Sequence, residues 1–285
     1  MAEYKTELKI VAAQTNPKIF EKEKNLDDME SKIKNAANKD SKLIVFPECS
    51  ISGYVFRNRE ETENVAEKIP GPSTKKLLKE ARKHEIYIVA GLVEKEENNY
   101  YNTSFLVGPK GYIGKYRKIH PWLPVEKKWP VKTGNLGFPV FSTEIGKIGM
   151  LICYDIYYPE SSRALALKEA DIITHLTNEF EWTDNFPFSD YLLRTRAMSN
   201  HVWIVGANRV GKERKVEFAG RSQIVDIHGN IIKEASPNQE EIISANIDPK
   251  KATQDKKISS EEDSDMFKTR VPESYSAITK QLNRD

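Results

Sequence analysis

The sequence predicts a single α/β domain in which two mixed β-sheets stack face to face and helices cover the outside. Patterns typical of buried strands alternate with helical patterns, which indicates βα units and therefore parallel strands. Other strands are joined by short turns, which indicates hairpins and therefore antiparallel pairs. The 285 residues contain no repeat and no linker rich in proline and glycine, so one core is expected.

The first part of the chain predicts a strand, a helix and a second strand. Residues 8–14 form a mainly apolar run, which Asn16-Pro17 ends. Residues 25–38 carry apolar side chains at helical spacing. Residues 43–46 are again apolar and lead into Pro47-Glu48, so we expect a buried strand that ends at this point.

The middle of the chain predicts one helix and then hairpins. Ser73 or Thr74 can cap a helix that runs to about His84, because a hydroxyl group can accept from the free N–H groups of the first turn. Runs rich in β-branched and aromatic residues then recur between glycine-containing turns. The strands are predicted at 86–93, 101–107, 112–118, 140–144 and 148–152, with turns at 108–111 and at Gly146 and a loop at 134–137.

The second half of the chain predicts two helices between strands, and then a hairpin. Pro159 is suited to the first turn of a helix over 159–170, because the proline nitrogen has no hydrogen to leave unpaired there. A second helix is expected over 188–200. The strands are predicted at 171–176, 202–207, 222–227, 231–234 and 241–247, with a turn at His228-Gly229-Asn230.

The C-terminal stretch differs from the rest. We expect the domain to span residues 1–249. Residues 250–285 are highly polar up to Asp265 and then carry Met266, Phe267 and Tyr275. Apolar side chains in so polar a tail predict an arm that packs on the domain or on a partner subunit.

Composition excludes several classes of protein. The 44 basic and 42 acidic residues give a net charge of +2 and are interspersed, whereas a nucleic-acid-binding protein needs a basic stripe. No apolar run is long enough to span a membrane. The first residues lack the charged-then-apolar layout of a secretory signal, and two cysteines make no disulfide framework. A cytoplasmic protein is expected.

Cys153 is the first candidate for chemistry. It follows the buried strand 148–152 and precedes the helix at Pro159, which predicts a partly exposed thiol that faces free backbone N–H groups. Such surroundings lower the pKa of a thiol and make its thiolate a nucleophile. The alternative is an inert buried cysteine, which is how we interpret Cys49.

Three other residues carry charge at the end of a strand or hairpin. Glu48 follows the strand 43–46, Lys118 ends the strand 112–118, and Glu126 comes eight positions after Lys118. Each by itself is compatible with an ordinary loop or surface residue. His120, close to Lys118, is expected to brace the loop.

These residues lie in motifs that, in this order, resemble the nitrilase superfamily of carbon–nitrogen hydrolases. The resemblance extends over nearly the whole chain. The motifs are Phe46-Pro47-Glu48, Gly53-Tyr54, Gly71-Pro72, Tyr101-Asn102-Thr103, the segment 111–118 with Lys118-Ile119-His120, Ile152-Cys153-Tyr154-Asp155 with Pro159-Glu160, Arg194-Thr195-Arg196-Ala197, and 265–275 near the end.

The resemblance implies a Glu-Lys-Cys triad formed by Glu48, Lys118 and Cys153, with Glu126 as the supporting second glutamate. In this arrangement Glu48 moves protons, Cys153 forms a thioester, and Lys118 stabilises the oxyanion together with a backbone N–H such as that of Tyr154. The resemblance also implies a four-layer α-β-β-α sandwich, and a homodimer or a larger homo-oligomer.

The segment after the strand 171–176 is expected to line the substrate pocket. Its candidates for substrate binding are Asn178, Glu179 and Trp182, together with Tyr154 from the cysteine motif. Glu179 and Glu181 can pair with a basic end of the substrate, or they belong to an ordinary polar loop.

The predicted activity is hydrolysis of a small amide, which releases ammonia and a carboxylate. The alternatives within enzymes are a nitrilase that converts a small nitrile to an acid and ammonia, and hydrolysis of an N-carbamoyl amine or amino acid. An alternative of another class is a catalytically silent binding protein with the same fold. No cofactor and no metal are implied, because the five histidines show no metal-ligand spacing.

Overall fold

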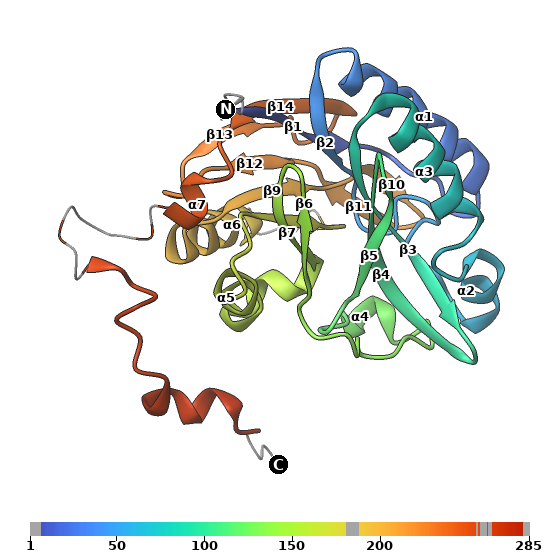
Figure 1. Ribbon diagram of the computed structural model, residues 1–285. Coiled ribbons are helices and arrows are strands. Elements are labelled where there is room, and N and C mark those ends of the chain that lie inside the picture. The colour runs from blue at the N-terminus through green and yellow to red at the C-terminus, as the bar shows by residue number, and fades with distance from the viewer. Residues whose placement is uncertain (1–6, 181–187, 255, 257–260, 262–263, 282–285) are drawn as a thin grey trace.

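The computed structural model describes residues 7–180, 188–254, 256, 261 and 264–281, and it contains two six-stranded mixed sheets (Figure 1). The first sheet has the order β14 (Glu241–Ile247), β1 (Leu8–Gln14), β2 (Ser41–Val45), β3 (Tyr87–Glu96), β4 (Asn99–Gly108), β5 (Gly111–Arg117). The second has the order β13 (Ile231–Glu234), β12 (Gln223–Val225), β9 (Trp203–Ala207), β8 (Ile172–Leu176), β7 (Gly146–Ile152), β6 (Val140–Thr143).

Each sheet has a parallel centre and antiparallel flanks. Strands β1, β2 and β3 are parallel to one another, as are β7, β8 and β9, while the outer strands pair antiparallel. The parallel strands are joined by helices and the antiparallel pairs largely by turns, as the two kinds of pattern in the sequence predicted.

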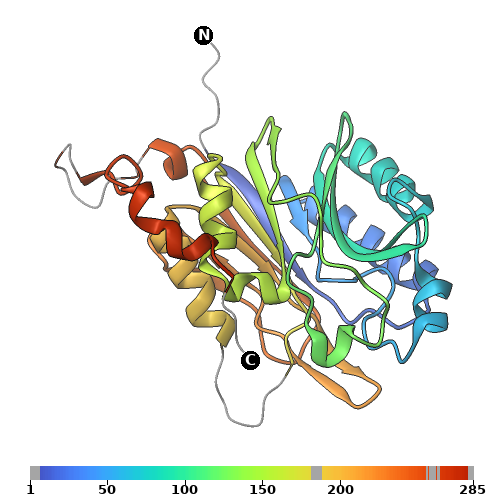
Figure 2. The same ribbon diagram turned by 90° about the horizontal axis from the view of Figure 1, so that it is seen from below.

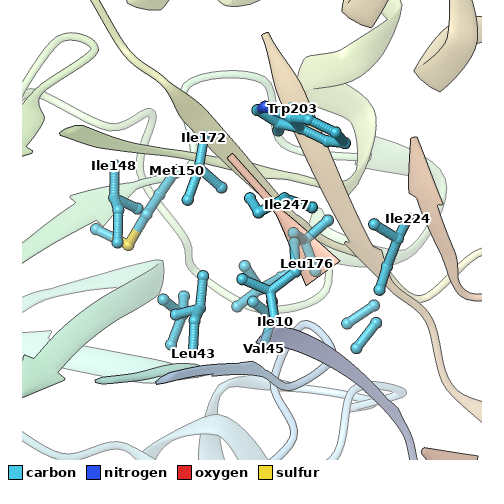
Figure 3. Close-up of a cluster of buried hydrophobic side chains, with 14 of the residues drawn as sticks. Ile10, Leu43, Val45, Ile148, Met150, Ile172, Leu176, Trp203, Ile224 and Ile247 are labelled. Carbon is cyan, nitrogen blue, oxygen red and sulfur yellow. The ribbon is translucent and has the colours of Figure 1, made fainter. Parts of the chain in front are cut away.

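The two sheets pack face to face around one apolar core. Ile10 and Leu43 come from the first sheet and Ile148, Met150 and Ile172 from the second, and all are buried (Figure 3). Their neighbours along each strand face the other way, because side chains alternate between the faces of a sheet.

Helices cover both outer faces of the stack, so the fold is the predicted four-layer α-β-β-α sandwich (Figures 1 and 2). α1 (Lys22–Ala37) and α3 (Pro72–His84) pack on the first sheet, and α5 (Pro159–Leu167) and α6 (Phe188–Asn200) pack on the second. On the first sheet, Leu26, Met29 and Leu77 bury the apolar faces of α1 and α3 against Ile44 and Ile88.

The start of α3 corrects one prediction. The helix begins two residues earlier than a Ser73 cap requires, with Gly71 as its N-cap and Pro72 in its first turn. Glu67 instead accepts hydrogen bonds from the backbone N–H of Ser73 at 3.0 Å and from its hydroxyl group at 2.8 Å. A carboxylate from the preceding loop therefore caps this helix.

Several short elements were not predicted, because they are too short to show a period. They are α2 (Arg59–Val65), α4 (Leu123–Glu126), the hairpin β10 (Val210–Glu213) and β11 (Val216–Ala219), α7 (Lys251–Gln254), and 3₁₀-helices at Cys153–Tyr157 and Pro272–Thr279.

The C-terminal stretch is partly packed and partly exposed. Ala252 in α7 is buried against the core between the sheets, and Phe267 lies under the guanidinium group of Arg163 from α5 at 4.9 Å. Further on, Val271 and Ile278 are exposed, and Figure 1 shows this last red segment apart from the two sheets. Within the described residues, none of the helices has the length and apolar character needed to cross a membrane.

Candidate active site

Long-range pairing of strands brings the predicted charged residues together. Glu48 follows β2, Lys118 follows β5 and Cys153 follows β7, while Glu126 ends the short helix α4. The backbone N–H of Lys118 donates to the carbonyl of Asn102 in β4 at 2.9 Å, which continues the β4–β5 ladder by one residue.

The Lys118 ammonium group joins the two glutamates. Its Nζ lies 2.8 Å from Oε1 of Glu48 and 2.8 Å from Oε1 of Glu126, and all three side chains are 0% exposed. Charges buried this completely are tolerated only when they are paired and hydrogen-bonded. In the sequence, Glu48 lies in one motif, and Lys118 and Glu126 lie eight positions apart in another. The fold brings the three residues into one cluster.

Asn102 is the residue of this cluster that the sequence analysis missed. Its Nδ2 donates to Oε1 of Glu48 at 2.7 Å and to Oε1 of Glu126 at 2.8 Å. Its Oδ1 accepts from the Cys49 thiol at 3.6 Å, so that Cys49 contacts the cluster through Asn102. The signal was present in Tyr101-Asn102-Thr103, which we used only as a mark of family resemblance.

The second glutamate is held by further donors. Glu126 also accepts from the hydroxyl group of Tyr54 at 3.3 Å and from the backbone N–H of Trp122 at 2.5 Å. Both carboxylate oxygens of Glu126 therefore have partners, which fixes the orientation of this side chain relative to Lys118.

Burial and the neighbouring charges set the protonation of Glu48 and Lys118. The pKa of Glu48 is raised to about 7, chiefly by burial. The positive charge of Lys118 lowers this pKa, and the negative charge of Glu126 raises it further. Although burial by itself lowers the pKa of Lys118, the two carboxylates raise it well above its usual value. Lys118 is therefore charged near neutral pH, and Glu48 can bind and release a proton there.

One oxygen of Glu48 remains available. Its Oε1 is bound by both Lys118 and Asn102, while its Oε2 is buried and has no hydrogen-bond partner among the residues that the structure describes. The carboxylate is therefore held through Oε1, while Oε2 can accept a hydrogen bond or a proton.

Cys153 occupies a strained position at the start of its 3₁₀-helix. Its φ is 46°, in the left-handed region that residues with a Cβ rarely adopt. Asp155 stabilises the turn, because its Oδ2 accepts from the backbone N–H of Ile152 at 3.0 Å and from the hydroxyl group of Tyr116 at 2.7 Å. The other oxygen of Asp155 lies 2.8 Å from Nδ1 of His120, which braces this loop.

The pKa of the Cys153 thiol differs from the sequence-based expectation. Burial, and next the negative charge of Glu48, raise the pKa of Cys153 to about 12, although Lys118 and a hydrogen bond with Thr177 act in the opposite direction. We had expected the backbone N–H groups to lower this pKa, and the expectation was wrong because desolvation dominates. The thiol is therefore neutral in the free protein.

A pocket of about 320 Å³ opens onto Cys153. Tyr154, Asn178 and Glu179 line it, as predicted for substrate-binding residues, whereas Trp182 and Glu181 lie outside the described residues. Glu48 and Lys118 are buried and are not among the lining residues, but their charges act on Cys153. The remaining lining residues are Tyr54, Trp122, Ile156, Tyr157, His175, Thr177 and Phe180.

The unpredicted hairpin β10–β11 supports one side of this pocket. Phe218 of β11 forms a bridge to Phe180, and the backbone N–H of Ala219 donates to the carbonyl of Glu179 at 2.9 Å. Glu213 of β10 pairs with Arg209 at 2.8 Å and accepts from the backbone N–H of Tyr54 at 2.9 Å. The Glu213 carboxylate therefore connects the loop that contains Tyr54 to the hairpin.

In the part of the chain that the structure describes, no group of three or more His, Cys, Asp or Glu side chains is arranged to hold a metal ion. His175 donates from Nε2 to the carbonyl oxygen of Cys153 at 3.0 Å, and burial lowers its pKa to about 4. It is therefore a neutral imidazole that supports the backbone at Cys153.

Comparison with known proteins gives a consistent result. The family model for carbon-nitrogen hydrolase matches residues 9–257. A nitrilase of Pyrococcus abyssi is 42% identical over 85% of this chain and 90% of its own length. An (R)-stereoselective amidase of a Pseudomonas species is 33% identical over 75% of this chain and 76% of its own length.

Solved structures include proteins with a similar fold. The amidase from Nesterenkonia sp. AN1, solved as a double mutant in complex with acrylamide, superposes with a TM-score of 0.80 over 98% of this chain and 99% of its own. Because the sequence identity is only 21%, this comparison shows a similarity of fold and nothing more.

Proposed function

The chain belongs to the carbon–nitrogen hydrolase family, and we propose that it hydrolyses a small primary amide to a carboxylate and ammonia through a thioester on Cys153. The observation that carries this proposal is the buried cluster of Lys118, Glu48 and Glu126. Its ammonium group binds one oxygen of Glu48 and one of Glu126 at 2.8 Å each, and the charges of Lys118 and Glu48 act on the thiol of Cys153, which lines the pocket.

In the first half of the reaction, Glu48 acts as the general base. Because the pKa of the Cys153 thiol is raised to about 12, the sulfur does not attack as a preformed thiolate. Oε2 of Glu48 takes the thiol proton while Sγ forms a bond to the amide carbon. The carbonyl oxygen becomes negative and is stabilised by the fixed charge of Lys118 and by the backbone N–H of Tyr154.

The same proton then completes the first half. The Glu48 carboxyl group returns it to the amide nitrogen, the C–N bond breaks, and ammonia leaves a thioester on Cys153. Water attacks this thioester while Glu48 accepts one of the water protons. When the C–S bond breaks, the carboxylic acid is released and the Cys153 sulfur regains its proton.

Glu126 and Asn102 act as positioning residues in this proposal. Both hold atoms that the reaction needs in one place: Glu126 holds the Lys118 ammonium group, and Asn102 holds Oε1 of Glu48. Since Lys118 is bound by two carboxylates, it remains charged when Glu48 becomes protonated during the attack.

Trapping of the intermediate tests the proposal. The protein is mixed with propionamide or benzamide and quenched in acid within milliseconds to seconds, and its intact mass is measured. We expect an added acyl group on a peptide that contains Cys153, together with ammonia release. Cys153→Ala serves as the control and should show neither. Turnover by that variant at the parent rate would overturn the proposal.

Nitrile hydrolysis is the second candidate, because the relative from Pyrococcus abyssi, at 42% identity, is a nitrilase. The same thiol attacks a nitrile to give a thioimidate, which water converts to the thioester with release of ammonia. Assays of ammonia on amides and nitriles with the same side chain separate the two activities. N-carbamoyl substrates are distinguished by release of carbon dioxide as well.

We also infer that the protein is a homodimer or a larger homo-oligomer. Apolar side chains are exposed on α5 and α6 and on the C-terminal arm, and a monomer would leave them in water. These residues are Leu167, Tyr191, Met198, Val271 and Ile278. Light scattering coupled to size-exclusion chromatography measures the mass directly, and a monomer mass at micromolar concentration would contradict the inference.

A further inference from the structure

Three buried asparagines lie in or near the candidate site, and one differs from the others. Asn102 donates to two glutamates and accepts from Cys49. Asn208 donates to the carbonyl of Gly220 at 2.6 Å and accepts from the backbone N–H groups of Glu179 at 3.0 Å and Arg209 at 2.9 Å. The side-chain amides of these two asparagines thus hold the structure together.

Asn178 is 2% exposed and lines the pocket beside Cys153. Its Nδ2 and its Oδ1 are both buried without a hydrogen-bond partner in the described part of the chain. We call this group the open amide. A buried donor or acceptor without a partner is destabilising, so that such a group in a folded protein requires an explanation.

The backbone on either side holds the open amide in place. The N–H of Thr177 donates to the carbonyl of Ala207 at 2.9 Å, which continues the sheet beyond β8. The N–H of Glu179 donates to the side chain of Asn208, and the carbonyl of Glu179 accepts from Ala219. Asn178 therefore sits on a fixed segment between two anchored neighbours, as a preorganised binding group requires.

An amide side chain presents two N–H donors and one carbonyl acceptor side by side. Another carboxamide satisfies both sides at once, because it offers a carbonyl oxygen to Nδ2 and an N–H to Oδ1. A nitrile offers only an acceptor and leaves Oδ1 unpaired. A binding site that requires a substrate N–H rejects the analogue that lacks it, because its own buried group then has no partner.

We propose that the open amide of Asn178 pairs with the carboxamide of the substrate and so selects primary amides and N-carbamoyl groups over nitriles. This inference rests on the proposed function and names the substrate class of the same pocket. The carbonyl oxygen of the substrate has two lone pairs, so that it accepts from Nδ2 of Asn178 and from Lys118 together. The N–H bound to Oδ1 belongs to the leaving group, which Asn178 thereby orients.

The test compares binding of matched pairs to the full-length Cys153→Ala variant, in which turnover does not interfere. Propionamide with propionitrile, and benzamide with benzonitrile, differ only at the reacting group. Titration calorimetry or ligand-observed NMR gives the Kd values. We expect the amide of each pair to bind about 10- to 100-fold more tightly. In the Cys153→Ala, Asn178→Leu double variant this preference should disappear through weaker amide binding, with nitrile binding little changed.

Thermal unfolding of the single variants separates binding from folding. Asn178→Leu replaces unpaired polar atoms with an apolar side chain of similar size, so its Tm should stay the same or rise. Asn208→Leu is the matched control, since Asn208 is 3% exposed and its amide has partners, and its Tm should fall. A fall for Asn178→Leu as large as that for Asn208→Leu would show a structural role and overturn the proposal.

The remaining outcomes distinguish this inference from the proposed function. Equal loss of amide and nitrile binding in the Cys153→Ala, Asn178→Leu double variant, relative to Cys153→Ala, overturns the inference. This holds even if the parent protein hydrolyses amides. The same holds if the amides bind no more tightly than the nitriles, or if none of the four compounds binds. Amide-selective binding that depends on Asn178, in a parent that releases no ammonia, supports the inference and overturns the proposed function.

Discussion

Replacing Glu126 by glutamine changes the charge next to Glu48 and keeps the size of the side chain. Oε1 of Glu126 and Oε1 of Glu48 each lie 2.8 Å from Nζ of Lys118. That geometry places the two oxygens about 5 Å apart, where two unit charges repel by about 3 kcal/mol at an effective dielectric constant of about 20. This repulsion is one reason why the pKa of Glu48 is raised to about 7.

The sign of the effect follows from the proposed role of Glu48 as a general base. Below its pKa the carboxyl group is protonated and cannot accept the thiol proton, so kcat/KM of the parent should rise with pH through about 7. In Glu126→Gln the repulsion is absent and the carboxylate persists to lower pH. We expect the acidic limb to move down by about two pH units, since about 1.4 kcal/mol corresponds to one unit. The plateau should fall, because Lys118 loses a charged partner.

The assay is initial-rate ammonia release between pH 4.5 and 8.5 at constant ionic strength. Glu80→Gln is the control, because it removes a buried carboxylate and one negative charge on the outer helix α3. This control should leave the acidic limb in place. An acidic limb in Glu126→Gln that stays near pH 7 or moves upward would refute the reasoning, since neither can follow from the loss of a neighbouring negative charge.

Three further changes have predictable results. Asn102→Leu removes a hydrogen bond that lowers the pKa of Glu48, so the acidic limb of the same pH profile should move upward by about one pH unit, opposite to Glu126→Gln. Glu213→Ala leaves Arg209 buried without its charged partner and should lower the free energy of unfolding in urea by about 3–5 kcal/mol; a loss below about 1 kcal/mol would contradict this. Leu43→Ala opens a cavity between the sheets and should lower the free energy of unfolding in urea by about 2–5 kcal/mol. The m-value, which is the slope of this free energy against urea concentration, should stay unchanged.

The buried site explains how a reactive group is kept unreactive. The pKa of the Cys153 thiol is raised chiefly by burial, so that little thiolate is present at neutral pH to react with oxidants. In the proposed mechanism, Glu48 removes the proton only when an electrophilic carbon is in contact with the sulfur. We therefore expect slow alkylation of Cys153 by iodoacetamide in the free protein, with a rate that increases with pH.

Local patterns in the sequence determined most of the fold. The strands and long helices were predicted because their side chains repeat with the periods of a strand or a helix, which neighbouring residues set by themselves. The motifs around Glu48, Lys118 and Cys153 also indicated the family, because each motif consists of consecutive residues and can be recognised in the sequence itself. Elements of only a few residues, such as α4 and the hairpin β10–β11, were missed because no period can develop over that length.

Only the tertiary structure decided the arrangement and the protonation of the site. Asn102 binds Glu48, which is 54 positions away in the chain, and Glu126, which is 24 positions away. Contacts between residues this far apart cannot be predicted from the local sequence pattern. The raised pKa of Cys153 depends on desolvation, which exists only once the sheets have packed. For the same reason the sequence could name Asn178 as a pocket residue but could not reveal its open amide, because hydrogen-bond partners are properties of the folded chain.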